Sequence, residues 1–426
     1  MYRELLFYTF AFSAFIPIYQ AYKRPRKLYE LPFLYGVACF VFIIPTLFFV
    51  KEDNYLLTDS QYNRYVLNAI ICFWAAIWGY HSINNAQRIE KNRKELVYSD
   101  NKIFIAILPL ILIGGYASSL IDPSEFGSEQ GGIFAIILFF SRLLRPAIVI
   151  LFTTYLMKSN QKKLILLLFY LALSLQFIII SGRRSEVFNL VITIIFPLFF
   201  IKKAYIPKQF IIPAIILVIT VIAVLPVTRE FTKRGEFNQL LNLSLTEISS
   251  AYLSGERTNE VIEAAINMEV VDREGIYNYG VSMYNYLVHQ YASSTIFGSD
   301  VKKSLFIEKV NMDRLREKYF WMGDAVGYKG YLSYTGFAAT FYEFGYFGCI
   351  LFFLFGRLTK SFWVRTQDGN IFWVLFYCCF ATFILFSVYH SIMAIPTIFL
   401  PILIILIGVM NYAKIKSYTI NNKSYA

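Results

Sequence analysis

Long apolar runs, each close to the length that crosses a membrane, dominate the pattern of hydrophobic and polar positions along the chain. A spanning helix needs about 20 mostly apolar residues. On this criterion the sequence predicts eleven spanning helices, at 4–21, 31–50, 65–83, 103–121, 132–157, 163–181, 186–201, 209–226, 336–356, 371–389 and 393–412. The expected fold class is therefore an all-α polytopic integral membrane protein.

One long interval, 227–335, does not fit the spanning pattern. Leu241, Leu245 and Ile248 recur there at helical spacing, and 301–320 mixes apolar with charged residues. We expect this segment to be partly helical and to lie over one membrane face, because its aromatic content argues against disorder. The predicted organisation is helices one to eight in 1–226, a surface segment in 227–335, helices nine to eleven in 336–412 and a tail in 413–426.

Composition supports a membrane protein and excludes several other classes. The 426 residues are 57% hydrophobic and only 16% charged, which a soluble domain of this length would not tolerate. The five cysteines all lie within apolar runs without metal-ligand spacing, so neither a disulfide nor a metal site is expected. The net charge of +12 is explained by basic cytoplasmic loops, and we do not expect nucleic-acid binding.

The charges of the short loops alternate along the chain and predict its orientation. Basic loops follow the first predicted helix (Lys23 to Lys27), the third (88–102) and the fifth (Lys158 to Lys163), whereas 122–129 is acidic. Because Lys and Arg concentrate on the cytoplasmic side, the N-terminus is predicted outside and the C-terminus inside. The first apolar run has no small-residue cleavage site after it and is predicted to be a retained helix.

One outer loop breaks this rule. Ser181-Gly182-Arg183-Arg184-Ser185-Glu186 joins two apolar runs on the predicted outer side and carries two arginines. Guanidinium groups match phosphate oxygens with two parallel hydrogen bonds, so Arg183 and Arg184 are candidates to bind a phosphate or pyrophosphate. Contact with lipid headgroups is the alternative explanation. Glu186 lies close enough to orient an arginine or to act as a base.

Two further pairs of arginines are predicted near the same membrane boundary. Arg142 and Arg145 are three residues apart in the fifth helix and therefore share a face, and Pro146 is expected to kink that helix. Ionisable residues inside a span usually face a cavity or a partner, although a shorter span would leave both at the interface. Arg229 and Arg234 follow the eighth helix, and all these groups together predict a cationic pocket at the outer face.

The candidate bases are few. His289 is the only histidine of the 227–335 segment, and a lone histidine is either a structural hydrogen-bonding group or a base. Glu343 is nearly the only acidic residue within the predicted spans, which argues against a proton-coupled carrier. The sequence contains no P-loop, no glycine-rich dinucleotide motif and no HExxH motif.

Three of these features together resemble the Wzy-type polymerases of O-antigen and capsular polysaccharide. They are Ser181-Gly182-Arg183-Arg184 at a mid-chain helix end, one long outer segment late in the chain, and Phe344-Gly345-Tyr346-Phe347-Gly348 near the start of the next helix. The resemblance covers the hydropathy plan of the whole chain but only about 25 residues of motif. Ala339 stands near the place of the family's common acidic residue, and Glu343 is offset from it.

The resemblance implies a metal-independent glycosyltransferase of GT-C type in the bacterial cytoplasmic membrane. Such an enzyme transfers a glycan from undecaprenyl pyrophosphate to a sugar hydroxyl of another lipid-linked repeat unit, and it can work with a chain-length regulator. No cofactor is expected. The leaving pyrophosphate requires positive charge at the outer leaflet. The expected pyrophosphate ligands are Arg183, Arg184, Arg229, Arg142, Arg145 and Arg234, and the candidate bases are Glu186, His289 and Glu343.

Three other functions stay open on the sequence. An O-antigen ligase would share the fold and the donor and differ in its acceptor. A flippase for lipid-linked oligosaccharides would also line an outward-facing cavity with arginines, although two similar halves are not found. A non-catalytic scaffold of a polysaccharide export complex is the third alternative.

Overall fold

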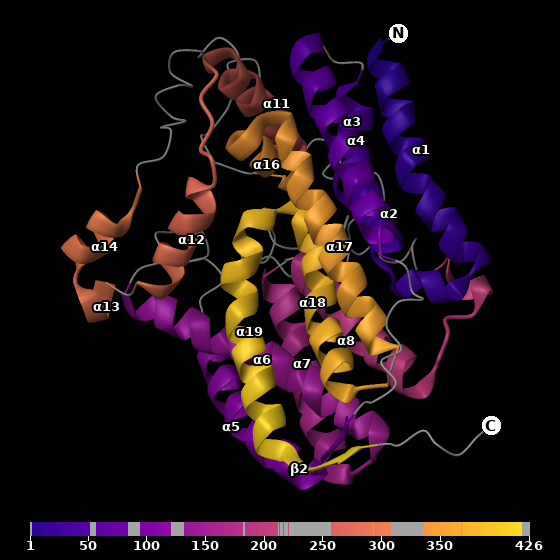
Figure 1. Ribbon diagram of the computed structural model, residues 1–426, viewed down its shortest axis with the longest axis vertical. Coiled ribbons are helices and arrows are strands. Elements are labelled where there is room, and N and C mark those ends of the chain that lie inside the picture. The colour runs from indigo at the N-terminus through magenta and orange to yellow at the C-terminus, as the bar shows by residue number, and fades with distance from the viewer. Residues whose placement is uncertain are drawn as a thin grey trace, which may run out of the picture.

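A computed structural model shows a predominantly helical protein (Figure 1). It describes residues 2–51, 57–83, 94–120, 132–181, 184–211 with 213, 216 and 220, 257–292, 294–307, 335–367 and 369–419. The elements are α1 (Tyr2–Lys23), η1 (Pro25–Tyr29), α2 (Leu31–Phe42), α3 (Ile44–Val50), α4 (Asp59–His81), β1 (Lys94–Tyr98), α5 (Asp100–Ser119), α6 (Gly132–Met157), α7 (Gln161–Ser181), α8 (Arg184–Lys202), α11 (Arg257–Glu274), α12 (Val281–Tyr291), α13 (Ser294–Phe297), α14 (Ser299–Leu305), α16 (Gly336–Phe344), η7 (Gly345–Gly348), α17 (Cys349–Thr366), α18 (Ile371–Tyr389), η8 (Ile392–Ala394), α19 (Ile395–Ala413) and β2 (Lys414–Thr419).

Long apolar helices confirm the coarse fold prediction. Within the described residues, seven segments are long and apolar enough to cross a membrane. They are Tyr2–Lys23, Leu31–Val50, Asp100–Ser119, Phe139–Met157, Gly336–Thr366, Ile371–Tyr389 and Ile392–Ala413. Helices also stand where 65–83, 163–181 and 186–201 were predicted, while 209–226 lies mostly outside the described residues. The predicted count of eleven spans is therefore not confirmed.

Two predicted spans, 31–50 and 336–356, lie in segments that are long and apolar enough to cross a membrane, but neither is one continuous helix. The run 31–50 divides into α2 and α3 at Ile43, two residues before Pro45, which cannot donate a helical hydrogen bond. The run 336–356 divides into α16, η7 and α17 at Gly345, whose φ is +58°. An L side chain rarely adopts that conformation, so the glycine permits the turn. By contrast, α6 continues through Pro146 as one helix.

Helices α4 and α17 of the bundle pack closely against each other through two glycines. A methyl group added at Gly79 would lie 1.9 Å from the carbonyl oxygen of Phe353, and one added at Gly356 would lie 2.0 Å from that of Ala76. Backbones approach this closely in membranes only where side chains are small. Because glycine has no side chain, Gly79 and Gly356 allow the short distance between α4 and α17 and hold α17 against the N-terminal helices.

Contacts between distant segments agree with the predicted alternation of sides. Strands β1 and β2 pair antiparallel, with Leu96 opposite Ser417, and both belong to segments predicted inside. At the opposite end of Figure 1, the N-terminus lies near α11 and α16. There Arg3 forms an ion pair with Asp59, and both were predicted outside. Which of the two ends faces the cytoplasm stays a prediction.

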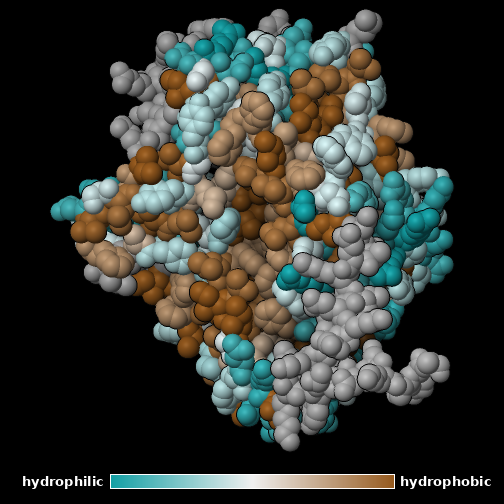
Figure 2. Space-filling model, viewed as in Figure 1, coloured by the Kyte–Doolittle hydropathy of each residue, from teal (hydrophilic) through white to brown (hydrophobic). Residues whose placement is uncertain are grey.

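The surface also has the pattern of a membrane protein. Hydrophobic residues cover the middle of the face shown in Figure 2, and hydrophilic residues gather at the top and the lower end. Large apolar side chains point outward from the helices, as at Phe12 (66% exposed), Leu112 (63%) and Ile404 (62%). Water would penalise such exposure, whereas lipid acyl chains would not.

The helices of the 227–335 segment dock on the membrane bundle. Helix α11 packs on α4 and α16, where Arg64 of α4 forms an ion pair with buried Glu269 and another with Asp272, 2.7 Å between Nη2 and Oδ2. Burial and the Asp272 carboxylate raise the pKa of the nearby Tyr277 hydroxyl. Helices α11 to α14 confirm that the segment is partly helical, while its parts at 227–256 and 308–334 lie outside the described residues.

Candidate functional site

Arg142 links the spanning helix α6 to helix α12 of the 227–335 segment. Its Nη1 donates a hydrogen bond of 2.9 Å to the side-chain Oε1 of Gln290. This partner is a neutral amide, and no carboxylate lies within ion-pair distance of Arg142 in the part of the chain that the structure describes. The arginine therefore retains a positive charge at the contact between the two helices.

Arg145 lies one turn further along the same face of α6. Its guanidinium carbon is 5.8 Å from the ring centroid of Phe383 on α18. The side chain is partly exposed, but its Nε and Nη2 atoms are buried and have no hydrogen-bond partner among the described residues. Leaving a buried donor unpaired costs about 1–3 kcal/mol, and more for a charged group. Such donors are available to an anion that enters from outside.

Glu186 and Tyr170 complete the surroundings of Arg145. Glu186 stands in the first turn of α8, where its Oε2 accepts a hydrogen bond of 3.3 Å from Asn189. It interacts electrostatically with Arg145 and with Tyr170 of α7. Helices α6, α7 and α8 thus each contribute one polar side chain to the same region. A carboxylate near an arginine can hold the guanidinium in place or accept a proton.

Helix α12 is held over this region at both of its ends. At its N-terminal end the backbone N–H of Gly280 donates to Oε2 of Glu343 at 2.7 Å, and Gly280 has a φ of +91°. At its C-terminal end the Tyr291 hydroxyl donates to the carbonyl oxygen of Thr397 at 2.7 Å. Burial raises the pKa of Tyr291, and the positive charge of Arg142 opposes this effect. Tyr291 therefore stays protonated at neutral pH and keeps this hydrogen bond.

The candidate bases lie at different ends of α12. His289 precedes Gln290, is exposed, and its carbonyl oxygen accepts a hydrogen bond of 3.3 Å from the Lys302 ammonium. Glu343 is almost fully buried and binds the opposite end of the helix. Ten residues at 1.5 Å per residue separate these ends by about 15 Å. The geometry therefore groups His289, rather than Glu343, with the arginines of α6.

The structure describes only some of the predicted site residues, so their convergence stays a prediction. Arg142 and Arg145 share a face of α6, Glu186 approaches Arg145, and His289 adjoins the partner of Arg142. Arg184 is the first residue of α8, but its side chain lies outside the described part of the structure. The remaining predicted arginines also lie outside the described residues: Arg183, Arg229 and Arg234.

Sequence reasoning missed two residues of this site. Gln290 is neutral and carries no motif, so only the docking of α12 on α6 reveals it. Tyr170 is one of many tyrosines in apolar runs, and only the packing of α7 brings it near Glu186. As for metals, no group of three or more His, Cys, Asp or Glu side chains suited to a metal ion occurs among the described residues.

Comparisons with known proteins add no assignment. No family model, no curated protein and no solved structure matches this chain.

Proposed function

We propose that this protein polymerises lipid-linked oligosaccharide repeat units at the outer face of a bacterial cytoplasmic membrane. The observation that carries the proposal is Arg145, whose buried guanidinium N–H groups point to no partner among the described residues of an apolar helix. A membrane protein keeps a cation with unsatisfied donors inside an apolar helix mainly for function. A lipid-linked pyrophosphate presents the negative charge and the apolar tail that this location accommodates.

In the proposed reaction, the hydroxyl oxygen of an acceptor sugar attacks the anomeric carbon of the donor glycan. The bond between that carbon and the pyrophosphate oxygen breaks, and the lipid pyrophosphate leaves with the electron pair. Arg145 and Arg142 stabilise the charge that develops on the leaving oxygen, together with Arg183, Arg184, Arg229 and Arg234. His289 or Glu186 takes the proton of the acceptor hydroxyl.

The contact between Arg142 and Gln290 gives this scheme a spatial basis. It ties the helix that would hold the donor to the helix that carries His289. A donor bound at α6 and a base on α12 are then held at a fixed separation, which is the main requirement for reaction between two large substrates. In this scheme Glu343 positions α12 and does not take part in proton transfer.

The test uses a strain that lacks the gene and carries variants of the chain. Arg145→Ala and Arg145→Lys are compared with Arg365→Ala, a variant of an arginine of α17 that packs on Trp373 at 4.3 Å. Arg365 stands in the last turn of α17, in a segment predicted on the cytoplasmic side. We expect Arg145→Ala to lower polymer synthesis by roughly 100-fold or more, Arg145→Lys to restore part of it, and Arg365→Ala to retain it, as judged by gel banding of surface polysaccharide.

Membrane abundance of each variant must match the wild type. Normal chain lengths from an abundant Arg145→Ala variant would overturn the proposal. The deletion strain separates the alternative functions: a polymerase loss leaves single repeat units at the surface, a flippase loss leaves none, and a ligase loss leaves polymer that is not attached to the lipid A core.

A further inference from the structure

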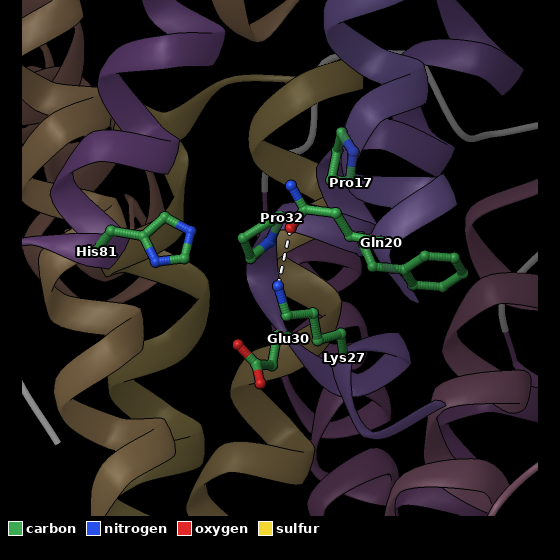
Figure 3. Close-up of a pocket in the computed structure, with 7 residues that line it drawn as sticks. Pro17, Gln20, Lys27, Glu30, Pro32 and His81 are labelled. Carbon is green, nitrogen blue, oxygen red and sulfur yellow. Dashed lines mark hydrogen bonds between the residues drawn. The ribbon is translucent and has the colours of Figure 1, made fainter. Parts of the chain in front are cut away.

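A small pocket opens at the end of the helix bundle that the charge pattern assigns to the cytoplasm, away from Arg145. It lies where the end of α1, the turn η1, the start of α2 and the end of α4 meet, as Figure 3 shows. The lining residues are Pro17, Gln20, Lys27, Glu30, Pro32, Phe33 and His81.

Two cations at this pocket have neutral partners. The Lys27 ammonium donates to the amide Oε1 of Gln20 at 2.8 Å, the bond drawn in Figure 3. Its neighbour Arg26 donates to the amide Oε1 of Gln367. No carboxylate lies within ion-pair distance of Lys27 or Arg26 in the described part of the chain. His81 faces the pocket from α4 and interacts electrostatically with Lys27.

The one carboxylate of the lining is already engaged. Glu30 accepts a hydrogen bond of 2.9 Å from the Tyr80 hydroxyl. It also interacts electrostatically with Lys360, a buried lysine of α17 whose ammonium lies 4.6 Å from the Tyr80 ring centroid. Glu30 therefore balances the charge of Lys360, and the positive charge of Lys27 and Arg26 stays available.

The pocket adjoins an apolar, aromatic surface. Trp78 (72% exposed) and Trp74 (40% exposed) precede His81 on α4 by three and seven residues, so helical periodicity puts them on one face. Tryptophan at such a position is typical of the boundary between acyl chains and headgroups. Pro17 and Phe33 supply the apolar side of the lining itself.

We propose that the exposed surface at the mouth of this pocket binds the phosphate headgroup of an anionic phospholipid, with Lys27 at the phosphate and the acyl chains along α1 and α4. Arg26 adds positive potential beside it. Basic pockets between spanning helices on the cytoplasmic side recognise such headgroups. A free phosphate would satisfy Lys27 equally well but would leave the aromatic surface of α4 without a partner, so the lipid is the better match.

The experiment is native mass spectrometry of the full-length protein in detergent. The protein is incubated with phosphatidylglycerol or with phosphatidylcholine of identical acyl chains. The variants are Lys27→Gln, Lys27→Arg and the control Lys23→Gln, a lysine four residues earlier that packs on the Tyr19 ring at 4.5 Å. We expect the wild type to retain phosphatidylglycerol preferentially and Lys27→Gln to bind it roughly fivefold more weakly. Lys27→Arg and Lys23→Gln should bind like the wild type.

Three results would overturn the proposal. The first is unchanged phosphatidylglycerol binding by Lys27→Gln. The second is an equal loss in Lys23→Gln, which would indicate unspecific attraction. The third is displacement of the lipid by millimolar inorganic phosphate, which would identify the ligand as the free ion. Thermal melting of each variant without lipid verifies that it is folded.

Discussion

Glu343 of α16 accepts a hydrogen bond of 2.7 Å from the backbone N–H of Gly280, the residue that precedes α12. The carboxylate is almost fully buried. Burial of the Tyr286 hydroxyl on α12 raises the pKa of that group, and the negative charge of Glu343 raises it further. The only acidic side chain that the sequence offered within the last spans thus fastens the helix that carries His289. Its position at the opposite end of that helix from Arg142 favours a positioning role.

Substitutions at Glu343 distinguish positioning from proton transfer. Glu343→Gln keeps an oxygen that accepts the Gly280 N–H, so we expect near wild-type stability and substantial polymer synthesis. Glu343→Ala leaves that N–H unpaired and lowers the free energy of unfolding by about 1.5–3 kcal/mol. Thermal melting in detergent and gel banding measure the two effects. A folded Glu343→Gln variant without activity would instead identify Glu343 as the base.

The glycine contact between α4 and α17 predicts a steric effect. In Gly356→Ala the new methyl group would meet the Ala76 carbonyl oxygen at 2.0 Å, and the helices must separate. We expect a loss of about 1–3 kcal/mol in the free energy of unfolding. Gly408→Ala on α19 is the matched control, because nothing lies within 4 Å of its added methyl. Equal melting temperatures for both variants would contradict the close packing.

The ion pair between Arg64 and Glu269 should be important for the docking of α11. The Glu269 side chain is 3% exposed and that of Arg64 is 17% exposed. Arg64→Ala therefore leaves the buried Glu269 carboxylate with less positive charge to balance it. We expect about 3 kcal/mol of destabilisation. Arg273 bonds the same carboxylate but is 44% exposed, and Arg273→Ala should cost under about 1 kcal/mol. Chemical denaturation compares the two variants, and a larger loss for Arg273→Ala would refute this assignment.

Thiol labelling tests the predicted orientation. Phe297→Cys on α13 and Ile415→Cys on β2 replace side chains that are both 54% exposed. A membrane-impermeant maleimide should label the first in intact spheroplasts and the second only after permeabilisation, because the two segments were predicted on opposite sides. The native cysteines give little background, since four are buried and Cys349 is partly buried. The reverse labelling pattern would invert the topology.

Local sequence pattern predicted the helices well because hydrophobic length is a property of each segment by itself. The bounds 132–157 and 371–389 agree with α6 and α18 to the residue. The interruptions at Ile43 and Gly345 were not predicted, since an apolar run looks the same whether or not a turn divides it. The pairing of β1 with β2 was missed for a related reason: the two strands are more than 300 residues apart and are short.

In the candidate site, too, local sequence pattern predicted some features, and packing between distant segments set the others. The spacing of Arg142 and Arg145 predicted that both lie on one helix face, and the cost of a charge inside an apolar helix made them candidates for a functional role. The partner of Arg142, the approach of Glu186 to Arg145 and the separation of Glu343 from both follow from how α6, α8, α12 and α16 pack.

Local sequence patterns are enough to predict a helical membrane protein, its apolar segments and the positions of its unusual charges. Those properties depend on composition, local periodicity and the free energy of transfer into lipid. The contact of Gln290 with Arg142, and that of Glu343 with the other end of α12, become visible only when the helices are packed together. Such contacts depend on backbone turns and on close packing between segments far apart in the chain, which no local pattern encodes.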